Sequence, residues 1–175
     1  MRLLAPRVVC VLLIFSISGF AQTPSVKLCV AGMQVNGGVR SDTAGQDALI
    51  KFLNKEKGDK ALSIESLPIP PSVPADALTA AKQKECDYVV TTNQTESTSQ
   101  SSYWGTAAST SPVNMQTFFV TTAYKLTKVS DGAEMSSGSM KASDKGGEQS
   151  ALSITLKKIA DKVTQTIRKA GPIAK

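Results

Sequence analysis

The chain has 175 residues, a formal net charge of +6 and no histidine. Its length suits one domain with one hydrophobic core. The missing histidine excludes Ser-His and Cys-His catalytic pairs and every histidine-ligated metal site. The fourteen acidic residues form no paired acid and base motif and no Asp-x-Asp-x-Asp-Gly calcium loop. We therefore expect a protein that is not an enzyme and that carries no cofactor and no metal.

The first 21 residues have the pattern of a signal peptide. Arg2 and Arg7 form a basic head, the run Val8–Ile17 is apolar, and Ser18-Gly19-Phe20-Ala21 places small residues where a signal peptidase cuts. A membrane-spanning helix needs about 20 apolar residues, roughly twice this run. We expect export to the periplasm or the medium, cleavage after Ala21, and no stable membrane insertion afterwards. An uncleaved amino-terminal anchor is the alternative.

Two cysteines remain once the leader, with Cys10, is removed. Cys29 and Cys86 form an even number in an oxidising compartment, which favours a disulfide. Such a bridge would close a loop of about 57 residues and stabilise the fold by roughly 4 kcal/mol. The alternative is a pair of small, buried, reduced thiols on neighbouring strands.

Short strands and helices alternate through the first half of the mature chain. The patterns predict a strand over Val26–Ala31, a helix from Ala44 to Lys57 after the capping residues Ser41-Asp42-Thr43, a strand over Ala61–Leu67, an extended connector over Pro68–Pro74, and a helix from Pro74 to about Glu85. That helix leads directly into an apolar strand, Cys86–Thr92. This succession is typical of a βαβ unit.

The second half begins with a polar stretch and ends in a helix. Because residues 93–116 are rich in Ser, Thr, Gln and Gly, we expect a long flexible loop there, with Tyr103 and Trp104 at its tip. Alternation predicts a hairpin of Gln116–Val129 and Ala133–Ala142. A helix from Glu148 to Lys169 follows. Its apolar stripe consists of Leu152, Leu156, Ile159, Val163 and Ile167.

These elements predict an α/β (α+β) sandwich. We expect a mixed sheet of about five strands and three helices, in the order β-α-β-α-β-β-β-α, with the helices mainly on one face. A single domain would span residues 22–170 and include the flexible loop, and residues 171–175 would form a tail. The sequence shows no internal repeat and no sign of a second domain.

Two segments resemble exported bacterial domains. The run from Ala80 to Val90, AAKQKECDYVV, resembles an alanine-rich helix followed by Ala-Asp-Tyr-Val-Leu, and Tyr124 to Gly132, YKLTKVSDG, resembles a strand ending in Asp-x-x-Thr-Gly. Both are similar to the curli-secretion (CsgG-like), penicillin-binding-protein activator (LpoB-like) and TolB amino-terminal domains. The chain differs in having Cys86 where alanine is usual, and in lacking a lipid-anchor cysteine, pore-forming hairpins and a propeller. The resemblance implies a scaffold that binds other envelope proteins and has no catalytic residues.

Two functions from different classes fit these observations. The first is a protein-interaction or scaffold module of the cell envelope, with Tyr103 and Trp104 as its recognition tip and the sheet edge as a second docking surface. Trp104 folding back onto its own domain is the alternative at that position. The second function is binding or sensing of an anionic small molecule or glycan through Lys125, Lys128 and Lys141. Nucleic-acid binding is not expected, because the basic residues are spread out and do not surround aromatic ones. Neither the partner nor the oligomeric state follows from the sequence.

Overall fold

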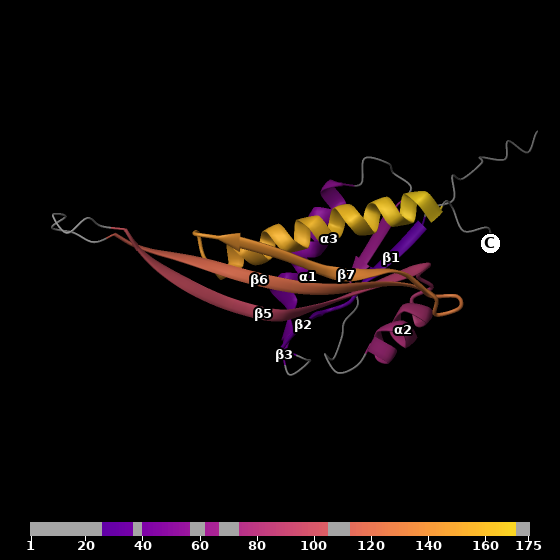
Figure 1. Cartoon of the computed structure of the whole chain (residues 1–175). Coiled ribbons are helices and arrows are strands. Elements are labelled where there is room, and N and C mark those ends of the chain that lie inside the picture. Colours follow the sequence, from indigo (N-terminus) through magenta and orange to yellow (C-terminus); the bar gives the residue numbers. More distant parts are fainter. Residues whose placement is uncertain (1–25, 37–39, 57–61, 67–73, 105–112, 171–175) are drawn as a thin grey trace, which may run out of the picture.

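The computed structural model describes residues 26–36, 40–56, 62–66, 74–104 and 113–170. They form one mixed sheet of seven strands with three helices (Figure 1). In chain order the elements are β1 Val26–Val30, β2 Met33–Val35, β3 Arg40–Asp42, α1 Thr43–Lys55, β4 Leu62–Ser66, α2 Pro74–Gln83, β5 Tyr88–Trp104, β6 Val113–Lys128, β7 Glu134–Asp144 and α3 Glu148–Ala170. The predicted α/β class and its three helices are confirmed, and the sheet has more strands than expected.

Strand β5 is the axis of the sheet. Its first residues pair in parallel with β1, which pairs in parallel with β4 on its other side. Farther along, β5 pairs in parallel with the short β2, and β3 lies antiparallel to β2. The opposite edge of β5 pairs with β6 along its whole length, and β7 follows, both antiparallel. The parallel pairing of β1 with β5 is what the helix-to-strand pattern before Tyr88 predicts.

Helices α1 and α3 cover one face of the sheet and enclose the main core. The predicted stripe of α3 is buried throughout, together with Leu49 and Leu53 of α1 and Leu28 and Val30 of β1. Asp42 caps α1 by accepting a hydrogen bond from the Ala44 N–H, as its position before the helix predicts. This face holds the bulk of the apolar side chains and therefore most of the hydrophobic stabilisation.

Helix α2 covers a small part of the other face. Alternation along β1 turns Cys29 and Ala31 toward α2, where they pack with Ala77 and Ala81 in a second, smaller core cluster. The rest of this face, which we call the outer face, is formed by β5, β6 and β7, and no described helix covers it (Figure 1).

The structure differs from the sequence-based expectations in two places. The flexible loop over 93–116 is wrong for residues 93–104 and 113–116, which belong to β5 and β6. The short strands β2 and β3 were not expected, since no element was predicted between Ala31 and the capping residues Ser41-Asp42-Thr43. The signal peptide, residues 67–73 of the proline-rich connector and the tail lie outside the described residues. None of the described helices is long and apolar enough to cross a membrane.

Candidate functional site

A two-stranded arm is the most prominent feature of the molecule (Figure 1). We define the arm as Glu96–Trp104 of β5 and Val113–Thr121 of β6, which pair antiparallel from Glu96 opposite Thr121 to Trp104 opposite Val113. Strand β7 reaches along β6 only as far as Phe118. Beyond that point the ribbon runs on without a third strand among the described residues, well past the start of α3.

One edge of this arm is open. The partner strand β2 leaves β5 at Gln94, and within the described residues nothing pairs with that edge from Thr95 to Trp104. Residues 95–102 are all exposed. Between Ser97 and Trp104 the strand carries no charge and no proline, the two devices that usually protect an exposed edge from pairing with another chain. Such an edge can accept an added strand through its backbone groups.

The root of the arm carries a side-chain hydrogen bond on each face, one between its own two strands and one to α3. A β-bulge at Thr95 marks where the arm leaves the β2 pairing, and bulges increase the local twist of a strand. On the outer face, Thr121 Oγ1 donates a hydrogen bond to Glu96 Oε2 over 3.0 Å. On the helical face, Gln94 Nε2 donates one to Glu148 Oε1, at the start of α3, over 2.8 Å. The arm therefore projects from an anchored base.

The outer face carries a shallow groove with a volume of about 460 Å³. This groove crosses three strands beside the root of the arm. Phe119 lies in its floor. Its side chain is 39% exposed, and among the described residues no other large hydrophobic side chain is classed as exposed. Most of the other lining side chains are polar or charged. The lining residues are Glu96, Thr98, Gln100, Phe119, Val120, Thr121, Lys141, Ala142 and Ser143.

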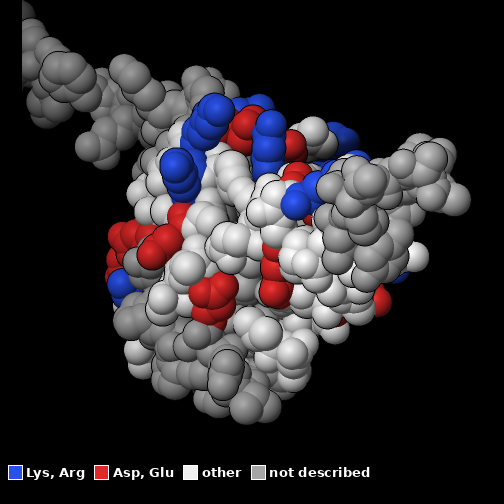
Figure 2. Space-filling view, turned by 90° about the vertical axis from the view of Figure 1, so that its left-hand side faces the viewer, with Lys and Arg blue, Asp and Glu red and all other residues white. Residues whose placement is uncertain are grey.

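The three lysines predicted to bind an anion are each paired with a carboxylate. Nζ to carboxylate oxygen distances are 3.0 Å from Lys125 to Glu134, 3.7 Å from Lys128 to Asp131 and 3.9 Å from Lys141 to Glu96. With each of these lysines paired, the hairpin offers no unbalanced positive charge. Figure 2, which views the molecule from the end where the arm projects, shows basic side chains along the upper rim with acidic ones among and below them.

Two of these carboxyl groups have shifted acidity. A hydrogen bond from the Ser137 hydroxyl, and then the contact with Lys125, lower the pKa of Glu134 below its usual 4.5. The backbone N–H of Ala133 does most to lower the pKa of Asp131 below 3.8. Both groups stay ionised near neutral pH and keep their lysines neutralised.

Tyr103 and Trp104 occupy the last two described positions of β5, in register with Asn114 and Val113. They lie on a strand at the end of the arm and not in a loop, and they are far along β5 from the three lysines. Phe119 was missed as a site residue. Strict alternation could have found it, because the core position of Phe118 on the same strand turns the next aromatic ring outward.

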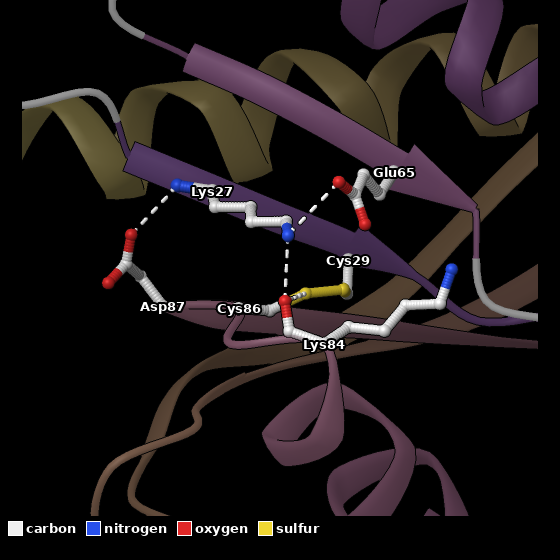
Figure 3. A network of polar contacts seen from close by, with 6 residues as sticks. All are labelled: Lys27, Cys29, Glu65, Lys84, Cys86 and Asp87. Atoms are coloured by element: carbon white, nitrogen blue, oxygen red, sulfur yellow. Dashed lines mark hydrogen bonds and ion pairs between the residues drawn. A yellow bond between two sulfur atoms is a disulfide. The ribbon is translucent and has the colours of Figure 1, made fainter.

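A second polar cluster surrounds the disulfide (Figure 3). Cys29 and Cys86 are bonded, with their Cα atoms 5.9 Å apart. Lys27 ties the neighbouring strands together. Its backbone N–H donates to Asp87 Oδ2 over 2.8 Å, and its Nζ lies 2.7 Å from the Lys84 carbonyl oxygen and 3.0 Å from Glu65 Oε1.

The cysteine and acidic side chains of this cluster come close enough to suggest metal ligands. The sulfurs of Cys29 and Cys86 and a Glu65 carboxylate oxygen lie within 4.8 Å of one another. Metals take cysteine as the thiolate, however, and here both sulfurs are committed to the disulfide. The Glu65 carboxylate is already paired with Lys27. The cluster therefore acts as a structural tie between β1, β4 and the start of β5.

Comparison with solved structures places this fold among known ones. Two crystal structures of the PelC dodecamer from Paraburkholderia phytofirmans are similar, with TM-scores of 0.55 and 0.51 and sequence identities of 14% and 16%. The first match covers 82% of this chain and 88% of PelC, and the second covers 77% and 85%. The chain and PelC share a fold, and identity this low shows nothing more.

The solved neighbours also include two of the three kinds of domain that the sequence motifs resemble. TolB from Acinetobacter baumannii matches with a TM-score of 0.44 and 14% identity, over 83% of this chain and 28% of TolB. The LpoB carboxy-terminal domain from Salmonella enterica matches with 0.40 and 14%, over 70% and 86%. These scores are too low to support an argument about function. The sequence matches no protein-family model and no curated protein.

Proposed function

We propose that this protein is an exported, non-enzymatic interaction module of the bacterial cell envelope that docks to another protein through its arm. The observation that supports the proposal most is the open, uncharged edge of β5 from Ser97 to Trp104. A partner strand added there gains backbone hydrogen bonds, and the aromatic residues Tyr103 and Trp104 supply side chains of the type that dominates interface energies.

The rigid root of the arm supports the same function. Because Gln94 ties the base to α3 and the two strands of the arm pair along its length, the arm loses little conformational freedom when it binds. Preorganisation of this kind raises affinity by lowering the entropic cost of association. A second copy of the chain is one partner to test, since PelC, which shares the fold, is a dodecamer.

Photo-crosslinking from position 104 in the native envelope tests this proposal. We expect one reproducible protein adduct, which mass spectrometry would identify as another protein or as a second copy. A crosslinker at the exposed Lys157 on α3 serves as the matched control and should not give the same adduct. Replacing Tyr103 and Trp104 together with serine should abolish the association.

Two results would contradict the proposal. One is an unchanged set of envelope associations in the Tyr103→Ser/Trp104→Ser variant. The other is crosslinking from position 104 to lipid or glycan alone. Light scattering of the parent protein and of this variant distinguishes a second copy of the chain from a different partner protein. Loss of a multimer in the variant identifies self-assembly, and an unchanged oligomeric state points to a different protein.

A further inference from the structure

The groove lies on the outer face of the base of the arm, and its chemistry differs from that of the arm's open edge. Phe119 lies in its floor, opposite Thr98 of β5 on one side and Ser143 of β7 on the other. The ring is 39% exposed, whereas the next side chain of β6, Val120, turns to the other face and is buried. One aromatic ring thus stands among hydroxyl and amide groups in a hollow of about 460 Å³. Pockets for small ligands fall between about 300 and 1,000 Å³.

The polar groups around the ring are available to a ligand. Within the described part of the chain, the side chains of Thr98, Gln100 and Ser143 have no hydrogen-bond partner, and all three are exposed. They present hydroxyl and amide groups that can both donate and accept. Their positions on β5 and β7 place them on both sides of Phe119, so a molecule lying on the ring meets hydrogen-bonding groups at its rim.

The charge at the groove is balanced. Lys141 Nζ lies 3.9 Å from Glu96 Oε2, and this carboxylate also accepts the hydrogen bond from Thr121. An anion approaching Lys141 therefore meets Glu96 at the same place, and a cation meets Lys141. A neutral ligand with many hydroxyl groups avoids both repulsions and can hydrogen-bond to either partner.

From these observations we propose that the outer face binds a neutral, pyranose-based oligosaccharide. Phe119 would pack against the apolar face of a sugar ring, and Thr98, Gln100, Ser143 and the Glu96–Lys141 pair would hydrogen-bond to its hydroxyl groups. A protein partner would require a larger apolar centre than one phenyl ring. The site goes beyond the proposed docking function and lies on the sheet face, away from the end of the arm.

Titration calorimetry with cellohexaose, chitohexaose and maltohexaose tests the site. We expect at least one of them to bind with a dissociation constant between about 10 μM and 1 mM. Binding should be insensitive to salt, since no net charge is involved. Phe119→Ala should weaken it at least about tenfold, whereas Phe119→Trp, which keeps an aromatic surface, should preserve it. The matched control is Thr117→Ala, on the same strand but outside the groove, and it should bind as the parent does.

The outcomes decide between this site and its alternatives. Gln100→Ala, at an exposed position, provides a second variant if Phe119→Ala lowers the unfolding temperature, and it should also weaken binding. Failure of all three sugars to bind would overturn the proposal, as would unchanged binding by Phe119→Ala. Salt-sensitive binding of an oligogalacturonate alone would overturn it in favour of an anionic ligand. Tyr103→Ser/Trp104→Ser should bind sugar normally, so the groove and the end of the docking arm can fail independently.

Discussion

Removal of the Cys29–Cys86 disulfide should cost a large share of the stability of the fold. The bridge joins residues 57 apart in the sequence, with Cα atoms 5.9 Å apart, a usual separation for bonded cysteines. In the chain-entropy model, closing a loop of this length lowers the entropy of the unfolded chain enough to stabilise the native state by about 4 kcal/mol at 25 °C. Small domains have a total stability of about 5–15 kcal/mol.

Urea unfolding of the mature protein, with and without a reducing agent, measures this difference. We expect the reduced protein to unfold at a lower urea concentration, with a free energy of unfolding lower by about 4 kcal/mol. The Cys29→Ala/Cys86→Ala variant is the control, since the reducing agent should not change its stability. A difference below about 1 kcal/mol would refute the reasoning. So would labelling of two free thiols in the unfolded, unreduced protein.

Three other predictions concern the core. Ile159→Ala, at a fully buried position of α3, should lower the free energy of unfolding by about 2–5 kcal/mol, against about 0.5 kcal/mol or less for the exposed neighbour variant Lys157→Ala. The hydroxyls of Thr122 and Thr155 lie 3.0 Å apart and buried, so Thr155→Val should cost about 1–3 kcal/mol and the double valine variant less than the two single changes together, in a double-mutant cycle of urea unfolding. Burial raises the pKa of Tyr88 above its usual 10.0, so the native state favours the neutral phenol. Stability is therefore full below pH 10 and falls as the pH rises through the raised pKa, and thermal melts of Tyr88→Phe should show less of this alkaline loss; equal losses would contradict it.

Hydrophobic periodicity predicted the parts of the fold that bury apolar side chains. The stripe of α3, from Leu152 to Ile167, is buried as its spacing requires, and Val120, Tyr124 and Leu126 of β6 lie on one buried face. These patterns work because each residue's burial is set by its own element. The capping residue Asp42 was also informative, since it acts locally on the first turn of α1.

The arm was not predicted because its strands are not stabilised by the burial of apolar side chains. The run from Thr95 to Ser102 has the composition of a flexible loop, yet it forms a strand because each of its residues after the bulge lies opposite a residue of β6, which supplies the ladder of hydrogen bonds along one edge. Strand formation of this kind depends on pairing and on the neighbouring strand more than on intrinsic preference. The strands β2 and β3 were missed for a related reason: each is only three residues long.

Folding of the molecule depends on its buried body, whereas the proposed binding uses its exposed arm. The core lies between the sheet and α1 and α3, whereas residues 95–102 of the arm are exposed and add little apolar burial. Substitutions along the open edge should therefore change association without changing stability, because they remove no packed side chain. The root is different. Thr121 and Glu96 form the base of the arm and also line the groove that contains Phe119, so a change there alters the docking arm and the groove together. Separate tests of the two surfaces must therefore use positions 103, 104 and 119 and leave the root intact.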